Sequence, residues 1–167
     1  MNGTILSLLF GVSLLSGALT APLSNMFEGR NLFEFIMGEY RYRKADGWAH
    51  TADIADNFKG VDFYKGIEFD GDINAQIAVS MKTTATTDVN KWLNSKPIQD
   101  NIKFLREGLI NPNGIKSHNR KLIFKKAEIH IYVPKENIHI KEEWMNVLKA
   151  KCPEIEFNIN ALENLLK

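Results

Sequence analysis

Four residues suited to phosphoryl chemistry occur along the chain in the order Glu34, Asp62, Ser80 and Lys82. Hydrolysis of a phosphodiester requires charge neutralisation at phosphorus and an activated water molecule. Carboxylates that hold Mg²⁺ or a similar hard cation supply both. A lysine beside them orients the water or stabilises the developing negative charge. The set therefore indicates hydrolysis of a phosphodiester, provided that the fold gathers the four side chains in one pocket.

A predicted β-hairpin brings three of these side chains to one face of a sheet. Two alternating runs, residues 61–69 and 76–83, flank an Asp-Gly-Asp turn signal. Successive side chains of a strand point to opposite faces, so Ser80 and Lys82 share a face. Asp62 joins them from the facing strand if the two strands pair in this register.

Glu34 belongs to a predicted helix over residues 25–44, for which Asn25 is a suitable N-cap. Its sequence neighbours are apolar, and the helix has apolar residues on two faces, which indicates that it is mostly buried. An unpaired carboxylate there costs on the order of several kcal/mol. Glu34 therefore needs a partner, a metal or a proton. Glu28 is the alternative to Glu34, and Glu68 is a candidate for a further carboxylate.

The remaining pattern predicts one α/β domain. Residues 45–60 read as a loop with a short helical turn. Downstream we expect a helix from Pro97 to near Gly108, a strand at 127–133, a helix around Trp144 that Pro153 stops, and a strand at 154–159. The last three elements make a βαβ unit with parallel strands and a right-handed crossover. The whole is expected to be a central mixed four-stranded sheet flanked by helices.

Three segments resemble a known family. They are Gly60-Val61-Asp62-Phe63-Tyr64, then Ala78-Val79-Ser80-Met81-Lys82-Thr83-Thr84, and the closing Ile129-His130-Ile131-Tyr132-Val133-Pro134 run with the helix and strand after it. Together they resemble the PD-(D/E)XK-like nucleases, in particular the C-terminal toxin domains of contact-dependent inhibition and Rhs-type proteins. In such toxins a helical Glu precedes the Asp, and in some of them Ser or Thr replaces the acid two positions before the Lys. The similarity covers roughly residues 25–160.

The resemblance implies a PD-(D/E)XK-like core and a metal-dependent endonuclease acting on DNA or RNA, including tRNA. Glu34 and Asp62 would hold a divalent metal, with Mg²⁺ expected first and Mn²⁺ or Zn²⁺ as alternatives. Ser80 would support the metal or the water, and Lys82 would assist the attack. A neutral hydroxyl at residue 80 binds a cation more weakly than the carboxylate that gives the family its name.

The resemblance also implies a bacterial toxin effector. Such a domain is neutralised by a cognate immunity protein and is delivered by a larger carrier protein into the cytoplasm of a target cell. Two alternatives stay open from the residues themselves: a non-catalytic secreted or envelope-associated binding module, and a repair or restriction-type nuclease.

Charge balance restricts how nucleic acid could bind. The 167 residues include 21 Lys and Arg against 20 Asp and Glu, so any phosphate-binding surface must be local. The densest positive patch contains Arg120, Lys121, Lys125 and Lys126. Thr83 and Thr84 are candidate phosphate contacts beside the catalytic set. The alternatives are a solvated basic face and two β-prone residues at a strand end.

Each catalytic candidate also has a structural interpretation. Glu34 could pair with an arginine at helical spacing, and Asp62 could be an exposed strand residue. Ser80 and Lys82 could lie on the solvent face of a half-buried strand. His130 alternates with isoleucines, which predicts an exposed strand position.

The single cysteine, Cys152, excludes an intramolecular disulfide and a multi-cysteine zinc site. Residues 1–23 are apolar or small and carry no charge, and the predicted nuclease-like domain spans 24–167. The apolar segment is interpreted as an N-terminal signal peptide or as a helix linking the domain to a carrier or partner. Its glycines and serines dilute the stretch, so no stable membrane span is expected.

Overall fold

The computed structural model describes residues 36–55 and 58–162. The chain divides into two units, Met1–Ile36 and Met37–Lys167, and the described residues other than Ile36 belong to the second. No helix within the described ranges is long and apolar enough to cross a membrane.

Several sequence predictions fall on residues outside the described ranges. These include Glu34, Glu28, the N-cap Asn25 and the domain boundary at residue 23. The described end of the predicted helix stops at Tyr40, a few residues earlier than expected.

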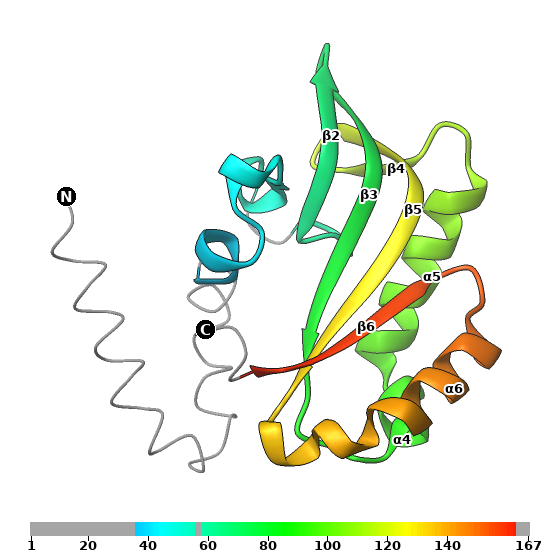
Figure 1. The fold of residues 1–167 in the computed structure, drawn as a ribbon. Helices are drawn as coiled ribbons and strands as arrows, with labels where there is room; N and C mark the ends of the chain where they lie inside the picture. The colour runs from blue at the N-terminus through cyan, green and yellow to red at the C-terminus, as the bar shows by residue number, and fades with distance from the viewer. Residues whose placement is uncertain (1–35, 56–57, 163–167) are drawn as a thin grey trace, which may run out of the picture. The chain divides into compact units, whose positions relative to one another are not determined.

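The sheet is mixed and six-stranded, in the order β1-β2-β3-β5-β4, with β6 also paired to β5 (Figure 1). The strands are β1 Ala49–His50, β2 Phe63–Phe69, β3 Asp72–Thr83, β4 Ile115–Ser117, β5 Arg120–Val133 and β6 Glu156–Ala161. The predicted four-stranded sheet is therefore too small, because β1 and β4 were not expected. Strands of two and three residues are too short to display a two-residue period in a sequence.

The predicted hairpin is confirmed, since β2 and β3 pair antiparallel around Asp70-Gly71. Both turn residues have positive φ, 52° at Asp70 and 82° at Gly71, which matches the twist of hairpin turns. The bounds differ from the prediction at both strands. β2 begins at Phe63, so Asp62 precedes the strand, and β3 begins at Asp72.

Helices connect the parallel strands. Between β3 and β5 lie α4 Val89–Leu93 and α5 Lys96–Ile110, and the latter is the helix predicted from Pro97. The short α4 was not predicted. Its N-cap is Asp88, whose carboxylate accepts hydrogen bonds from the N–H groups of Asn90 and Lys91.

The predicted strand-helix-strand unit is confirmed as β5, α6 Lys141–Lys151 and β6, with β5 and β6 parallel. A 3₁₀ segment, η3 Lys135–Ile140, leads into α6. β4 and β6 lie along the same edge of β5, at different positions. β4 pairs with residues 120–122 and β6 with residues 128–133.

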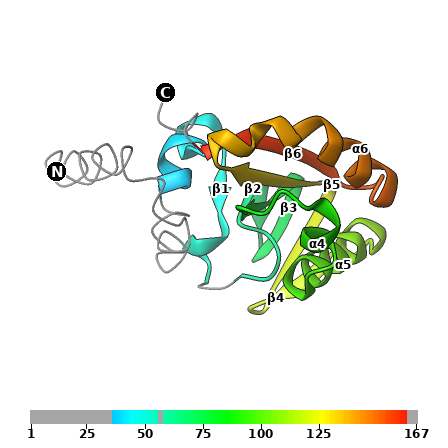
Figure 2. The same ribbon diagram turned by 90° about the horizontal axis from the view of Figure 1, so that it is seen from below.

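The main core lies between the sheet and the helices. Figure 2 shows α4, α5 and α6 on one side of the sheet, apart from the segment that carries β1. Buried residues of this cluster include Ala78, Ile129 and Ile131 from the sheet, and Leu105 and Trp144 from the helices.

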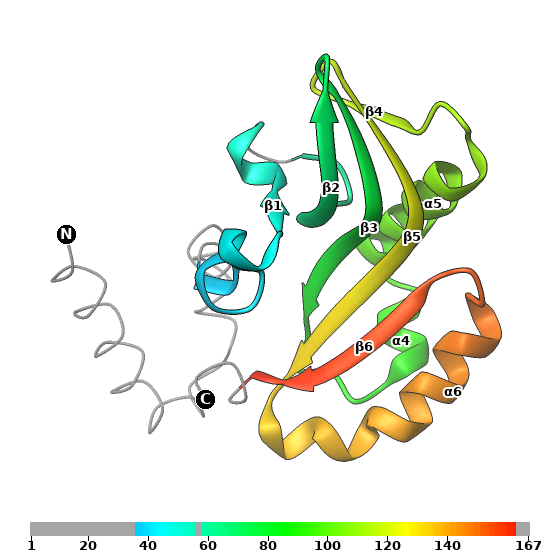
Figure 3. The same ribbon diagram turned by 45° about the horizontal axis from the view of Figure 1, so that its top comes forward.

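The opposite face buries a smaller aromatic group, Tyr42, Phe63 and Tyr132. The Tyr42 ring stacks on Phe63, with centroids 4.1 Å apart. Around it lie the 3₁₀ turns η1 Lys44–Asp46 and η2 Thr51–Asp53 and the short β1, which Figure 3 shows beside the start of β2.

The core position of Ile131 predicts a large effect on stability. We expect Ile131→Ala to lower the free energy of unfolding by about 2–5 kcal/mol, because the residue is fully buried and the change leaves a cavity. Ile110→Ala is the control, since Ile110 is 82% exposed and its truncation should cost less than about 0.5 kcal/mol. Urea denaturation measures both; equal losses would contradict this core assignment.

Candidate functional site

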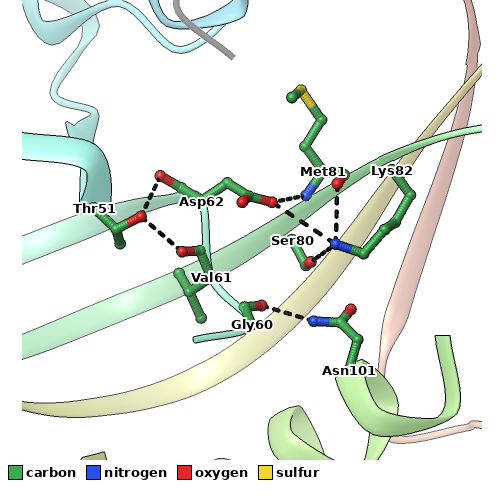
Figure 4. A network of polar contacts seen from close by, with 8 residues as sticks. All are labelled: Thr51, Gly60, Val61, Asp62, Ser80, Met81, Lys82 and Asn101. Atoms are coloured by element: carbon green, nitrogen blue, oxygen red, sulfur yellow. Dashed lines mark hydrogen bonds and ion pairs between the residues drawn. The ribbon is translucent and has the colours of Figure 1, made fainter. Parts of the chain in front are cut away.

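Asp62, Ser80 and Lys82 converge at one place (Figure 4). The Lys82 Nζ donates a hydrogen bond to Ser80 Oγ at 2.7 Å and another to the Met81 carbonyl at 3.1 Å. It also lies 4.0 Å from Asp62 Oδ2. Three of the four residues predicted as a catalytic set therefore share a site, and the fourth, Glu34, lies outside the described residues.

The strand pairing places Ser80 and Lys82 on the helix-covered face. Ser80 is the register partner of Ile129, and Lys82 that of Ile131, both of which belong to the main core. Ser80 is fully buried, and the Lys82 side chain is 17% exposed. The interpretation of this pair as a solvent face is therefore wrong, because α5 and α6 cover that side of the sheet.

Asp62 is held at the open end of the hairpin. Its N–H donates to the Val79 carbonyl at 2.8 Å, and its Oδ2 accepts the Met81 N–H at 2.5 Å. The carboxylate thus takes the place of a strand neighbour beside β3, where β2 has not yet begun. This contact fixes one carboxylate oxygen, while Oδ1 accepts no hydrogen bond from the described residues.

Two residues that the sequence did not single out support Asp62. The Thr51 hydroxyl contacts the carbonyl oxygens of Val61 at 2.7 Å and of Asp62 at 3.0 Å. From α5, Asn101 Nδ2 donates to the Gly60 carbonyl at 3.0 Å. A signal for Asn101 was available, since a polar residue there interrupts the apolar stripe of the helix. Nothing in the local pattern marks Thr51.

Gly60 has to be a glycine. Its φ is +70°, and an added Cβ would lie 2.3 Å from a ring carbon of Phe104 on α5. The turn before Asp62 therefore lies in close contact with α5.

The oxygen atoms at the site are of the kind that hard divalent cations prefer. They are the Asp62 carboxylate, the Ser80 hydroxyl and the Met81 carbonyl. Within the part of the chain that the structure describes, no three His, Cys, Asp or Glu side chains gather as a metal-binding group. The Ser80 hydroxyl and the Met81 carbonyl already accept hydrogen bonds from Lys82, so among the described residues Asp62 contributes the carboxylate that could hold a hard cation.

The structure does not bring Glu68 or the predicted basic patch to this site. Glu68 binds Arg120 at 2.6 Å, and Lys121 lies 3.7 Å from Asp72. Arg120 is eleven residues along β5 from Ile131, the partner of Lys82, which corresponds to roughly 36 Å of strand.

The other patch residues also lie away from Lys82. Lys126 bridges Glu128 at 2.9 Å and Glu156 at 2.7 Å, and Lys125 is exposed. Only Thr83 and Thr84, among the residues predicted to bind nucleic acid, directly follow Lys82 in the chain.

A second polar network lies on the opposite face of the sheet. His130 is buried, so its prediction as an exposed strand residue is wrong. Its Nδ1 lies 2.6 Å from the Tyr42 hydroxyl, and its Nε2 lies 2.7 Å from a Glu128 carboxylate oxygen. The Tyr42 hydroxyl is also 2.7 Å from that of Tyr132. The prediction failed because the Tyr42 side chain packs against His130 on this face.

The partners of His130 determine the direction of the hydrogen bonds. A carboxylate only accepts, so Nε2 donates to Glu128, and in a neutral ring Nδ1 then accepts from Tyr42. Burial raises the pKa of Tyr42 and of Tyr132, so both hydroxyls keep their protons. The hydrogen bond from His130, supported by Lys126 and opposed by burial, lowers the pKa of Glu128 to about 2.

No family model, curated protein or solved structure matches the chain. The chemistry of the site follows from its own geometry.

The tyrosine network predicts an effect of a single oxygen atom. We expect Tyr42→Phe to lower the free energy of unfolding by about 1–3 kcal/mol, because it removes a buried hydroxyl that joins His130 to Tyr132. Tyr40→Phe is the matched control, since Tyr40 is 41% exposed. Denaturant titration compares the two variants, and a Tyr42→Phe protein as stable as the control would contradict the network.

The lowered pKa of Glu128 predicts a pH dependence. The ordinary value is 4.5 and the folded value about 2, so ionised Glu128 contributes stability above pH 4.5. That contribution is lost as the pH falls from 4.5 through 2. We expect Glu128→Gln to be less stable than the unchanged protein at pH 6, with the gap closing toward pH 2. Thermal melts across this range measure it, and a constant gap would be evidence against the ionised contact.

Proposed function

We propose that this protein is a metal-dependent endonuclease of the PD-(D/E)XK type that hydrolyses phosphodiester bonds of DNA or tRNA. The observation that supports it best is the approach of Lys82 Nζ to Ser80 Oγ, at 2.7 Å, and to Asp62 Oδ2, at 4.0 Å. A hairpin followed by a parallel strand and a βαβ unit is compatible with the core of that family.

The carboxylates are assigned to metal binding. Asp62, with Glu34 from outside the described residues, would hold the divalent cation, for which Mg²⁺ is the first candidate. Bound there, the cation would neutralise phosphate charge and lower the pKa of a water molecule. Asp62 suits this task because the Met81 N–H fixes one of its oxygens while the other accepts no hydrogen bond from the described residues.

Lys82 is assigned to the developing charge. Its ammonium group is largely shielded from water, and a positive charge in such a place stabilises negative charge more strongly than it does in bulk solvent. Ser80 orients the ammonium group by accepting a hydrogen bond from it. The pair would therefore face the phosphate oxygens or the attacking water.

The biological setting belongs to the same proposal. The order Glu, Asp, Ser-x-Lys is that of toxin domains, so we infer a delivered effector that acts in the cytoplasm of a target cell. Its partners would be a cognate immunity protein and a larger carrier. Growth arrest on cytoplasmic expression, relieved by a neighbouring gene, would favour a toxin over a repair or restriction nuclease.

Two substitutions test the chemistry. We expect Lys82→Met and Asp62→Asn each to lower the cleavage rate of supercoiled plasmid or total tRNA by at least about 10²-fold, because each removes a charge from the site. Circular dichroism should be unchanged, since both side chains keep their approximate shape. EDTA should stop the reaction and Mg²⁺ should restore it.

Matched controls come from the same hairpin. Lys65→Met changes a lysine whose ammonium lies over the Trp48 ring, and Asp72→Asn changes a carboxylate at the far end of the strand. Both should retain cleavage. Full activity of Lys82→Met and Asp62→Asn on both substrates would refute the proposed function.

A further inference from the structure

A polar side chain lies on the buried face of α5. Asn101 is 8% exposed, and its neighbours on that face, Ile98, Ile102 and Leu105, are buried apolar residues. An amide in such a place loses its hydration and needs hydrogen-bond partners in return. Apolar packing alone therefore does not explain why asparagine occupies this position.

The orientation of the Asn101 amide is set by one contact. Its Nδ2 donates to the Gly60 carbonyl, which cannot donate in return, so the other amide atom is the oxygen. That Oδ1 is buried and accepts no hydrogen bond from the described residues. Buried acceptors in this condition are uncommon, and they mark strain, a catalytic role, or a bound water or ion.

On β3, the Ser80 hydroxyl is a buried donor without an acceptor among the described residues. Ser80 is fully buried, and its oxygen accepts a hydrogen bond from Lys82. The hydroxyl proton of Ser80 has no acceptor among the described residues. Figure 4 shows the Asn101 amide directed toward the Gly60 carbonyl, two residues before Asp62, whose carboxylate approaches Lys82. One buried donor and one buried acceptor thus belong to the same polar network.

We propose that Asn101 is a positioning residue of this site and that its Oδ1 and the Ser80 hydroxyl together bind one buried water molecule. The water would accept a hydrogen bond from the Ser80 hydroxyl and donate a hydrogen bond to Asn101 Oδ1, so that both groups have a partner. With its proton turned toward the water, Ser80 presents its lone pairs to the Lys82 ammonium. The assignment of a catalytic consequence rests on the proposed nuclease function.

The same side chain also acts on the carboxylate. Through the Gly60 carbonyl, Asn101 holds the turn that leads directly into Asp62. Asn101 would therefore position both parts of the site. It holds Asp62 through the backbone and the Ser80-Lys82 pair through the water.

Asn101→Leu is the first test. Leucine has a similar size and suits an apolar helix face, so we expect a thermal midpoint within about 3 °C of the unchanged protein. The kcat for plasmid or tRNA cleavage should fall by at least about tenfold, with KM within about twofold. The Met81 amide proton, which donates to Asp62 over 2.5 Å, should shift in the NMR spectrum because Asp62 moves. Asn101→Ala is the second variant, with the same expectations for kcat and Met81.

Gln99→Leu is the matched control. It exchanges an amide for leucine on the exposed side of the same helix, and it should leave kcat and the Met81 resonance unchanged. A crystal structure of the full chain should contain a water within hydrogen-bond distance of both Asn101 Oδ1 and Ser80 Oγ.

An unshifted Met81 resonance with full kcat in both Asn101 variants would overturn the positioning role. Well-ordered density with no water between Asn101 and Ser80 would overturn the water site. If the unchanged chain cleaves neither plasmid nor tRNA, the nuclease function fails, and the Met81 resonance and the crystallographic water still decide the role of Asn101.

Discussion

A lysine ammonium that is largely removed from water must be surrounded by oxygen atoms, and this requirement organises the site around Lys82. Its Nζ contacts the Ser80 hydroxyl and the Met81 carbonyl and lies 4.0 Å from the Asp62 carboxylate. The cost of desolvating a charge is recovered only if such oxygens are held in place. Thr51, Gly60 and Asn101 supply that support from separate elements.

The two faces of the sheet carry different clusters of polar residues. The helix-covered face carries the Asp62-Ser80-Lys82 site beside the main core, to which the strand partners Ile129 and Ile131 belong. The opposite face carries the Tyr42-His130 network, in which every hydroxyl and ring nitrogen has a partner. Buried networks of this kind specify one arrangement of the elements they join. Tyr42 is thereby tied to β5, and Asp62 is tied to β3.

Charge is arranged locally rather than across the whole surface. Arg120, Lys121 and Lys126 each have a carboxylate partner, so much of the positive charge near the start of β5 is neutralised within the protein. Exposed ion pairs contribute little to stability, but they also leave less uncompensated charge for a polyanion. Under the proposed function, a phosphate group at the site would therefore depend mainly on Lys82 and on a bound cation.

Local patterns in the sequence determine much of this fold. Alternation around Asp70-Gly71 specified the hairpin and the shared face of Ser80 and Lys82, and the pattern before and after Pro153 specified the βαβ unit. These features depend on neighbours two to four positions apart. Only the tertiary structure decided that Asp62 meets Lys82, that Asn101 supports Asp62, and that His130 is buried against Tyr42, 88 positions away. Such contacts depend on how whole elements pack, and a pattern of local periodicity carries no information about that.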